Sequence, residues 1–380
     1  MAILFGPHRN TRVDGYSSIC YDIYDQIKFL NDEDDTISSE RVKSIHNVTL
    51  PLEDQISGRI EMPDGMGIGV GVVKYVSPEV LRGDILVNFH VPEPNILNIK
   101  EGVYLVSLFL WETTGLLPSD VNALNQCNEV WTCSEWSKQV FIENGIYKPI
   151  YVFDLGFDPE VFKIKTNVDR GDQPFTYLHI GGNSERKNAD MVYYAFMKLH
   201  GGDPNYRLIL KISGPDDFLW RKNGKAELNR GEHPQVYVIN NFLTEEELAD
   251  LIRMSDCFIY PTTGEGWGLS PFKAIASGVP TICTNRTACE IYANLSVPLE
   301  AELSPSPYRD SFYRYGDVAN PKISDLCDRM RFVENNYDLV VKKTYEGAKH
   351  LHENYGWDKV GNQYAGRLKI IKEIMSVDNV

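Results

Sequence analysis

The sequence has few of the features that mark nucleic-acid-binding or disulfide-stabilised proteins. Its 38 Lys and Arg are outnumbered by 53 Asp and Glu, so the formal net charge of -15 gives no general attraction for polyanions or anionic lipids. The 7 cysteines are an odd number without a CxxC pair or a nearby His at zinc-finger spacing, which indicates free thiols in a reducing compartment. Any phosphate that the chain binds must therefore be held by a local site.

Long hydrophobic runs are absent as well. No segment approaches the ~18–20 apolar residues of a membrane-spanning helix, and the first residues, MAILFGPHRN, turn polar too early for a secretory signal. We therefore expect a cytoplasmic protein without a transmembrane segment. The glycines at 65, 67, 69 and 71 lack the GxGxxG spacing of a dinucleotide-binding loop.

What is present is a chain of globular composition. Its 380 residues are 43% hydrophobic and include 6 Trp, 21 Tyr and 16 Phe, which excludes a disordered protein. At a typical ~100–200 residues per domain, the length favours two domains with a cleft between them.

Short apolar runs alternate with amphipathic stretches, which predicts an α/β fold of parallel strands and crossover helices. In the first half the predicted strands are Ala2–Phe5, Ile85–His90, Val103–Trp111, Glu129–Thr132 and Ile150–Phe153, and the predicted helices are Ser17–Leu30, Asp120–Cys127 and Glu135–Asn144.

A charged, turn-rich stretch over 154–173 predicts a domain boundary. Beyond it a second series of strands is predicted at Tyr177–Ile180, Leu208–Ile212, Val236–Ile239, Cys257–Tyr260 and Thr281–Thr284. The clearest helix is Thr244–Ser255, in which Thr244 and Glu247 form a capping box. After Pro321 the chain is predicted to be helical, and Trp357, Val360, Tyr364, Leu368 and Ile371 fall on one apolar stripe.

The most informative stretch is residues 257–285, CFIYPTTGEGWGLSPFKAIASGVPTICTN, where an apolar strand leads through a glycine loop into a helix. Pro271 is predicted at the first helical position with Ser270 as its cap. The free N–H groups near Gly268 and Leu269 then point out of the strand ends, where they can hold a phosphate. Glu265 is placed to accept hydrogen bonds from the hydroxyls of a sugar. The alternative is an ordinary turn with a solvent-facing Glu265.

Three basic residues accompany this loop. Lys273 is predicted as the third residue of the helix, where the helix dipole disfavours a cation unless an anion is bound. Arg186 and Lys187 leave a second strand end in YLHIGGNSERKN and are placed to neutralise the charge of a departing diphosphate. The alternative for each is an exposed side chain.

Several motifs together resemble one family. EGWGLSPFKAIASGVP resembles the EGFGLP-type signature of family-4 glycosyltransferases of the GT-B fold, and NSERKN resembles their phosphate-binding turn. LGFDPEVF, FLWETTGLLPSDV and EVWTCSEWSKQVFIENG are similar to further motifs of that family. The resemblance covers about residues 84–371. It implies two Rossmann-like domains, acceptor-side 1–160 and donor-side 161–355, facing a cleft, with a closing helix over 356–380.

The resemblance also implies roles for individual residues. Glu265 would contact the donor sugar, and Lys187 with Arg186 would bind its diphosphate. Lys273 stands where the family's second Glu holds the nucleotide ribose, a departure from which we infer that it shares the phosphate with Arg186. The remaining donor-binding candidates are Gly266, Trp267, Gly268, Leu269, Gly182 and Gly15.

First-half candidates come from strand ends. His90 falls where family members place a polar group facing the donor sugar, although a capping His is the alternative. Glu112 ends the FLWE strand, where a buried carboxylate needs a partner. Tyr16 and Ser17 follow Gly15 at a helix start and are further cleft candidates.

The predicted activity is transfer of a hexosyl or pentosyl group from a nucleoside diphosphate sugar to the hydroxyl of a glycan or glycolipid. The resemblance implies retention of anomeric configuration. No DxD-like carboxylate pair stands out, so neither a metal nor a cofactor is expected. One alternative is glycosylation of hydroxymethylated DNA bases, against which the acidic charge balance argues. The others are a non-catalytic sugar-nucleotide- or glycan-binding protein and a phosphorylase.

Overall fold

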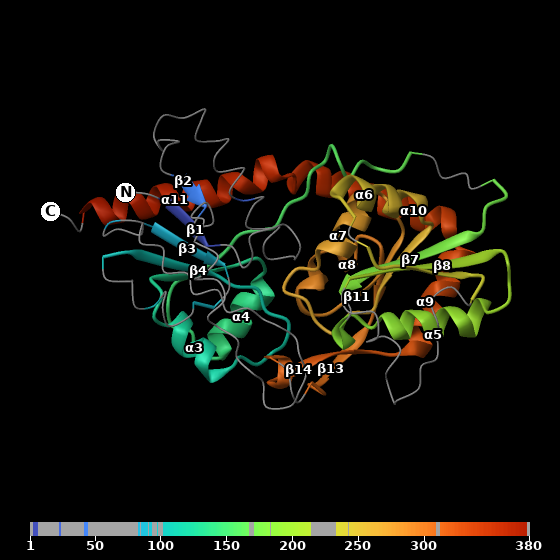
Figure 1. The fold of residues 1–380 in the computed structure, drawn as a ribbon, viewed down its shortest axis with the longest axis horizontal. Helices are drawn as coiled ribbons and strands as arrows, with labels where there is room; N and C mark the ends of the chain where they lie inside the picture. Colours follow the sequence, from blue (N-terminus) through green and yellow to red (C-terminus); the bar gives the residue numbers. More distant parts are fainter. Residues whose placement is uncertain are drawn as a thin grey trace, which may run out of the picture.

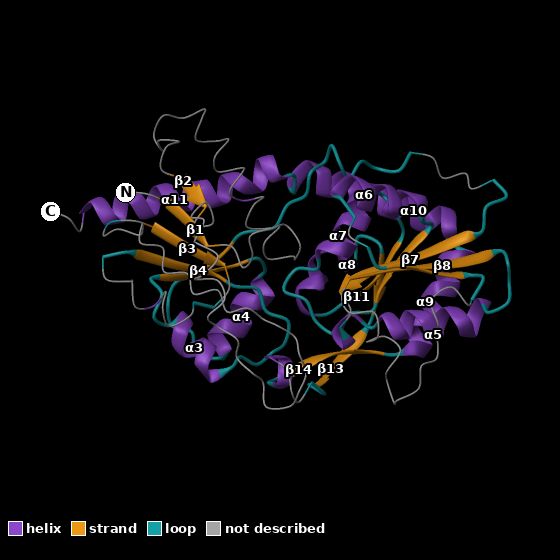
Figure 2. Cartoon of the chain, in the orientation of Figure 1, coloured by secondary structure: helices purple, strands orange, loops and turns teal. Residues whose placement is uncertain are grey.

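The computed structural model describes two parallel sheets and the segments between them. The residues described are 3–6, 23, 42–44, 83, 85–89, 91–92, 97, 102–166, 171–182, 184–213, 233–241, 243–308 and 312–377. Within these ranges each large sheet has six strands, with helices packed around it (Figure 1), and Figure 2 shows the two sheets in separate halves of the molecule. The predicted α/β class is confirmed.

The first sheet has the strand order β2-β1-β3-β4-β5-β6, and all neighbouring strands are parallel. Its strands are β1 (Ile3–Gly6), β2 (Val42–Ser44), β3 (Ile85–Phe89), β4 (Tyr104–Leu108), β5 (Glu129–Thr132) and β6 (Ile150–Val152). The helices α3 (Pro118–Leu124) and α4 (Glu135–Glu143) follow β4 and β5. Every residue of β3 and β5 is buried, as expected for strands covered on both faces.

One strand ends earlier than the sequence predicts. β4 stops at Leu108, although the N–H of Phe109 still donates to the carbonyl of Trp131 at 2.9 Å. Glu112 therefore lies in a loop beyond the strand and not at its last position. Beyond the strand, Leu110 and Trp111 lie directly against Gly266 of the second half.

The second sheet has the order β12-β11-β10-β7-β8-β9 and is also parallel throughout. Its strands are β7 (Phe175–Gly182), β8 (Tyr206–Ser213), β9 (Val236–Ile239), β10 (Cys257–Tyr260), β11 (Thr281–Thr284) and β12 (Val297–Leu299). Strands β9, β10 and β11 have the predicted bounds, and β12 was not predicted.

Helices α5 (Ala189–His200), α6 (Glu245–Met254), α7 (Leu269–Ala276) and α8 (Glu290–Ala293) connect these strands. The capping box of α6 is confirmed. Thr244 Oγ1 accepts from the N–H of Glu247 at 3.2 Å, and the Glu247 carboxylate accepts from the N–H of Thr244 at 2.8 Å. These bonds satisfy two N–H groups that the helix itself leaves without partners.

A hairpin that the sequence did not predict joins the two halves. It consists of β13 (Ala301–Pro305) and β14 (Asp317–Pro321), which pair antiparallel. At its end, the N–H of Thr114 donates to the carbonyl of Asp317 at 3.0 Å, and the N–H of Asp317 donates to Thr114 Oγ1 at 2.7 Å. The hairpin thus holds the loop after β4 against the second half.

The last part of the described chain is helical, as predicted. It contains α9 (Ile323–Asn335), α10 (Tyr337–Asn354) and α11 (Trp357–Val377). The predicted stripe of α11 is buried along its whole length. Figure 1 shows that α11 leaves the second half and runs along the first, where Tyr364 packs against Trp131 and Phe153.

The chain passes between the halves at two places that lie side by side. The N–H of Phe157 donates to the carbonyl of Tyr355 at 3.2 Å, and the N–H of Trp357 donates to the carbonyl of Phe157 at 3.1 Å. The outgoing and returning connections are therefore hydrogen-bonded to each other.

No helix in the described ranges combines the length and apolar character needed to cross a membrane. The cysteines in those ranges are buried free thiols, in agreement with the prediction: Cys127, Cys133, Cys257, Cys283, Cys289 and Cys327.

Candidate active site

Glu265 lies in the loop between β10 and α7 and is only 5% exposed. One of its oxygens, Oε1, accepts from Arg186 Nη1 at 2.9 Å and from Lys187 Nζ at 2.5 Å. The same oxygen accepts from Thr262 Oγ1 at 2.8 Å and from the Tyr260 hydroxyl at 3.0 Å. None of these four bonds is to Oε2.

This environment keeps Glu265 ionised. Burial by itself raises the pKa of the carboxyl group, but the charges of Arg186 and Lys187 outweigh burial, and the pKa falls to about 2. Glu265 is therefore an anion throughout the physiological pH range.

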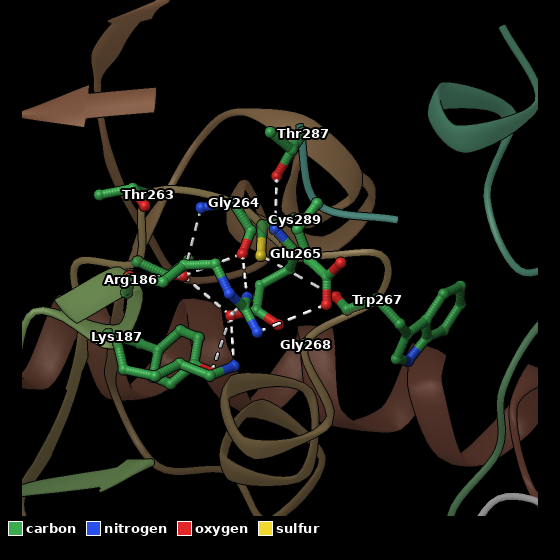
Figure 3. Close-up of polar contacts among 12 residues, drawn as sticks. Arg186, Lys187, Thr263, Gly264, Glu265, Trp267, Gly268, Thr287 and Cys289 are labelled. Carbon is green, nitrogen blue, oxygen red and sulfur yellow. Dashed lines mark hydrogen bonds and ion pairs between the residues drawn. The ribbon is translucent and has the colours of Figure 1, made fainter. Parts of the chain in front are cut away.

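Arg186 and Lys187 come from the 3-10 helix η3 (Glu185–Lys187), directly after β7. The N–H of Thr263 donates to the carbonyl of Arg186 at 2.9 Å and so holds η3 against the Glu265 loop. The Arg186 guanidinium also donates to the carbonyl of Gly264. Figure 3 shows both cationic side chains pointing towards Glu265.

The two cations respond differently to burial. Burial lowers the pKa of Lys187, and the neighbouring Arg186 lowers it further, against the effect of Glu265. Burial also disfavours the charge of Arg186, but Glu265 and Glu112 outweigh it and raise the pKa of Arg186. Arg186 is thus the firmly held positive charge of the site.

Glu112, from the loop after β4, completes the group. Its Oε1 lies 3.4 Å from Arg186 Nη2, and the residue is 8% exposed. Tyr313, in the 3-10 helix η6 (Phe312–Arg314), hydrogen-bonds to Glu112 and places its ring 5.1 Å from the Arg186 Cζ. The structure therefore brings together Glu112, Arg186, Lys187 and Glu265 from both halves, and we call these four residues the Glu265 group.

The glycines of GEGWG are required by close contacts. A side chain at Gly264 would lie 2.0 Å from the carbonyl oxygen of Glu112, and one at Gly266 would lie 2.8 Å from Leu110. Gly268 has a φ of 88°, which favours glycine, and a side chain there would meet the Tyr292 hydroxyl at 2.3 Å. Glycine at these three positions allows the loop to pass between the first half, which it contacts at Gly264 and Gly266, and Tyr292, which it contacts at Gly268.

The start of α7 differs from the prediction. The helix begins at Leu269, with Gly268 as its N-cap in the left-handed conformation, and not at Pro271 with Ser270 as cap. Pro271 is the third helical residue, where its missing N–H removes no helical hydrogen bond. The first-turn N–H groups still lie next to the Glu265 loop, as an anion site requires.

Lys273 is consequently the fifth helical residue. Its Nζ lies 2.5 Å from Oε2 of Glu245, at the start of α6, and 4.7 Å from the centre of the Phe162 ring. Within the described ranges its ion pair is with Glu245 and not with a member of the Glu265 group. Its role in phosphate binding stays a prediction.

The other predicted residues are placed as follows. Gly182 ends β7 with open space beside its Cα. The Trp267 side chain turns away from Glu265 (Figure 3) and packs against Phe272, with ring centres 5.3 Å apart. The Trp267 indole is therefore not part of the group around Glu265. Leu269 is the first residue of α7. His90, Gly15, Tyr16 and Ser17 lie outside the described residues.

Sequence reasoning missed the hydroxyl groups that complete the site. Tyr260 and Thr262 lie at the end of a predicted strand, and this position was the signal that could have pointed to them. Tyr313 gave no such signal, because it reaches the site through the unpredicted hairpin. His179 on β7 was also missed: its Nδ1 lies 2.8 Å from the carbonyl oxygen of Ile259, and burial lowers its pKa to about 4.

A cavity of about 450 Å³ lies elsewhere, lined by Lys165, Pro280, Tyr337 and Lys342 among others, none of which belongs to the Glu265 group. The loop after β4 lies directly against the Glu265 loop, at Gly264 and Gly266. Among the described residues, no group of three or more His, Cys, Asp or Glu is arranged to hold a metal ion.

Comparison with known proteins agrees with this geometry. A family model described as glycosyl transferases group 1 matches residues 161–294, which include Arg186, Lys187 and Glu265. The structural relatives include a glycosyltransferase from Rickettsia africae, with 14% identity, a TM-score of 0.62 and 98% of each chain covered. Another is a sucrose-phosphate synthase from Thermosynechococcus elongatus, with 11% identity, a TM-score of 0.58, and 76% of this chain and 73% of that one covered.

Curated relatives match over shorter stretches. An uncharacterized protein 356 of Sulfolobus islandicus rod-shaped virus 1 is 22% identical over 60% of this chain and 66% of its own length. O-antigen chain mannosyltransferase B of Escherichia coli is 30% identical over 29% of this chain and 29% of its own length. Mannosylfructose-phosphate synthase of Agrobacterium fabrum is 24% identical over 36% of this chain, which spans 33% of that enzyme.

The two parallel-sheet halves, the closing helices and the structural likeness define the GT-B fold. Within that fold, residues 161–294 match the glycosyl transferases group 1 family model.

Proposed function

We propose that the chain transfers a glycosyl group from a nucleoside diphosphate sugar to an acceptor hydroxyl. One observation carries the proposal: a buried Arg–Lys pair, held by Glu265, lies at the carboxyl ends of β7 and β10 beside the first turn of α7. In parallel α/β sheets this edge is where nucleotides bind.

In the proposed reaction, the bond between the anomeric carbon and the diphosphate oxygen breaks, and its electron pair goes to the diphosphate. The acceptor oxygen bonds to the anomeric carbon and its proton passes to the departing phosphate. Arg186, Lys187 and the first-turn N–H groups of α7 stabilise the negative charge that develops on the leaving group. We propose that Glu265 orients both cations through Oε1 and receives a sugar hydroxyl at Oε2.

The finer features are also proposals. The family resemblance supports retention of configuration, and the cationic pair supports a reaction that does not require a metal. The names of the O-antigen mannosyltransferase and the mannosylfructose-phosphate synthase favour a hexosyl donor, in particular a mannosyl donor, and a glycan acceptor.

The test is a thermal-shift and product screen with UDP-, GDP-, ADP- and CDP-sugars. A donor that binds the folded protein raises the melting temperature by mass action. Release or transfer of sugar should accompany binding, and Glu265→Gln should reduce the turnover. Glu353→Gln, at an exposed position of α10, is the matched control. Binding without any sugar release would instead indicate a sugar-nucleotide-binding protein.

A further inference from the structure

The Arg186 guanidinium lies between two carboxylates that belong to different halves of the molecule. Glu265 is 2.9 Å from Nη1, and Glu112 is 3.4 Å from Nη2. Lys187 adds a second cation at 2.5 Å from Glu265, and no side chain of the four is more than 15% exposed. With two positive and two negative charges, the group is electrically neutral as it stands.

A neutral buried group is a poor receptor for a diphosphate. The donor would bring at least two negative charges into a site where both cations already have counter-ions, and like charges in a buried site repel strongly. Binding therefore requires that one carboxylate gives up its contact or its charge.

The two carboxylates differ in how firmly they are held. Glu265 Oε1 accepts four hydrogen bonds, and its pKa is lowered to about 2. Burial raises the pKa of Glu112; Arg186 opposes that rise and Glu265 adds to it. The groups facing Glu112 are Arg186 and Lys187 of η3, Glu265 of the loop after β10, and Tyr313 of η6. Glu112 is the carboxylate that is more easily neutralised.

On the basis of the proposed function, we propose that Glu112 is the internal counter-ion of Arg186, which the diphosphate of the donor replaces, and that Glu112 takes up a proton from solvent when this happens. The exchange breaks the Glu112–Arg186 ion pair and forms a diphosphate–Arg186 pair, and the one proton taken up is returned when the product leaves. Donor binding therefore changes the contacts and the charge of Glu112, which lies in the loop after β4.

Proton uptake makes donor binding tighter as the pH falls. With one proton taken up per donor, the dissociation constant changes by at most about tenfold per pH unit. Nucleoside diphosphate sugars suit this test because their phosphates are diesters and lack the terminal phosphate group that titrates near pH 6.

The experiment is calorimetric titration of UDP-glucose, GDP-mannose, ADP-glucose and CDP-glucose, without acceptor, in two buffers of different ionisation enthalpy. The unaltered protein should take up a proton with the donor that binds. Glu112→Gln should bind that donor about tenfold more tightly or better, without proton uptake, because a neutral side chain no longer competes for Arg186. Glu143→Gln, exposed at the end of α4, should behave as the unaltered protein.

The outcomes are separable. Donor binding without proton uptake, or an unchanged dissociation constant in Glu112→Gln, would overturn the role of Glu112 and leave the proposed function intact. Absence of binding by all four compounds to both proteins would overturn the proposed function and this inference together. If Glu112→Gln does not fold, the proton uptake and pH dependence of the unaltered protein still decide the question.

Discussion

Among the buried glutamates of the described residues, Glu129 and Glu265 are paired with arginines in opposite ways. Glu129, at the start of β5, receives Arg367 of α11 on both oxygens, at 3.2 Å on Oε1 and at 2.5 Å on Oε2. Trp131 Nε1 and the Tyr104 hydroxyl donate to it as well, at 2.6 and 3.1 Å. Both oxygens of this carboxylate are therefore in use.

The Glu265 group is less completely paired. Its arginine is shared between two carboxylates, and the buried Nε of Arg186 has no partner among the described residues. A fully paired carboxylate fixes two elements to each other, whereas a shared arginine with a spare donor leaves room for a ligand. The contrast favours a structural role for Glu129–Arg367 and supports the proposal that Arg186 binds the donor.

The largest expected effect is on stability, from Arg367→Met. The substitution leaves Glu129 buried without its cation, and such a break costs about 3–5 kcal/mol of unfolding free energy. Urea denaturation measures the loss, while transfer activity per folded molecule should not change. The double variant Glu129→Gln with Arg367→Met should recover part of the stability. A loss below about 1 kcal/mol would contradict the structural role.

Lys187→Met is the corresponding change at the Glu265 group. Glu265 keeps Arg186, Thr262 and Tyr260, so the loss of stability should be smaller than for Arg367→Met. The transfer rate should instead fall by about 10²–10³, the effect of removing one preorganised charge-stabilising donor. Steady-state kinetics with the best donor measures this, and an unchanged rate would speak against Lys187.

The next prediction concerns the pH dependence of stability caused by His179, which is fully buried beside Tyr260. Its pKa is lowered from 6.5 to about 4 by burial, so between these values the unfolded chain binds a proton that the folded chain does not. The unfolding free energy should therefore decrease by about 3 kcal/mol as the pH falls from 6.5 to 4.

His179→Asn removes this titration and keeps an amide to donate to the carbonyl of Ile259. Denaturation curves of the two proteins at pH 7 and pH 4 measure the difference. Equal pH dependence in both would show that the imidazole is not held neutral.

The smallest effect is expected at Lys273, whose partner Glu245 has a side chain 48% exposed. Lys273→Met should cost at most about 1 kcal/mol of unfolding free energy. Because Lys273 pairs with Glu245, we expect donor affinity to fall less than in Lys187→Met. Unchanged donor affinity would contradict the prediction that Lys273 shares the phosphate with Arg186.

The sequence was most informative for short apolar strands, of which β10 and β11 are buried at every residue and the edge strand β9 only at Val236. β9, β10 and β11 stand out as short apolar runs bounded by turn residues, and their bounds were predicted correctly. The short β12 and the proline-containing β13 and β14 lack that pattern, and they were missed. Local composition identifies a strand when most of its side chains are apolar, as they are in the partly exposed β9 too.

For the site, the sequence predicted Arg186, Lys187 and Glu265, because each lies at a strand end with a motif around it. It did not predict that Glu112 pairs with Arg186 or that Tyr313 joins them. Those contacts depend on how the two halves pack against each other, which spacing along the chain does not encode. The same holds for Glu129 and Arg367.

The hydrogen-bonded pair of connections at Phe157 and Trp357 has a mechanical consequence. Because both covalent links lie side by side, we expect any movement of one half relative to the other to be a rotation about them and not a sliding motion. Such a rotation displaces most the parts farthest from these links, and Figure 1 shows the β13–β14 hairpin on the other side of the molecule from α11, which begins at Trp357. The Thr114–Asp317 hydrogen bonds therefore join the two halves at a second place, away from these connections, and they would resist such a rotation.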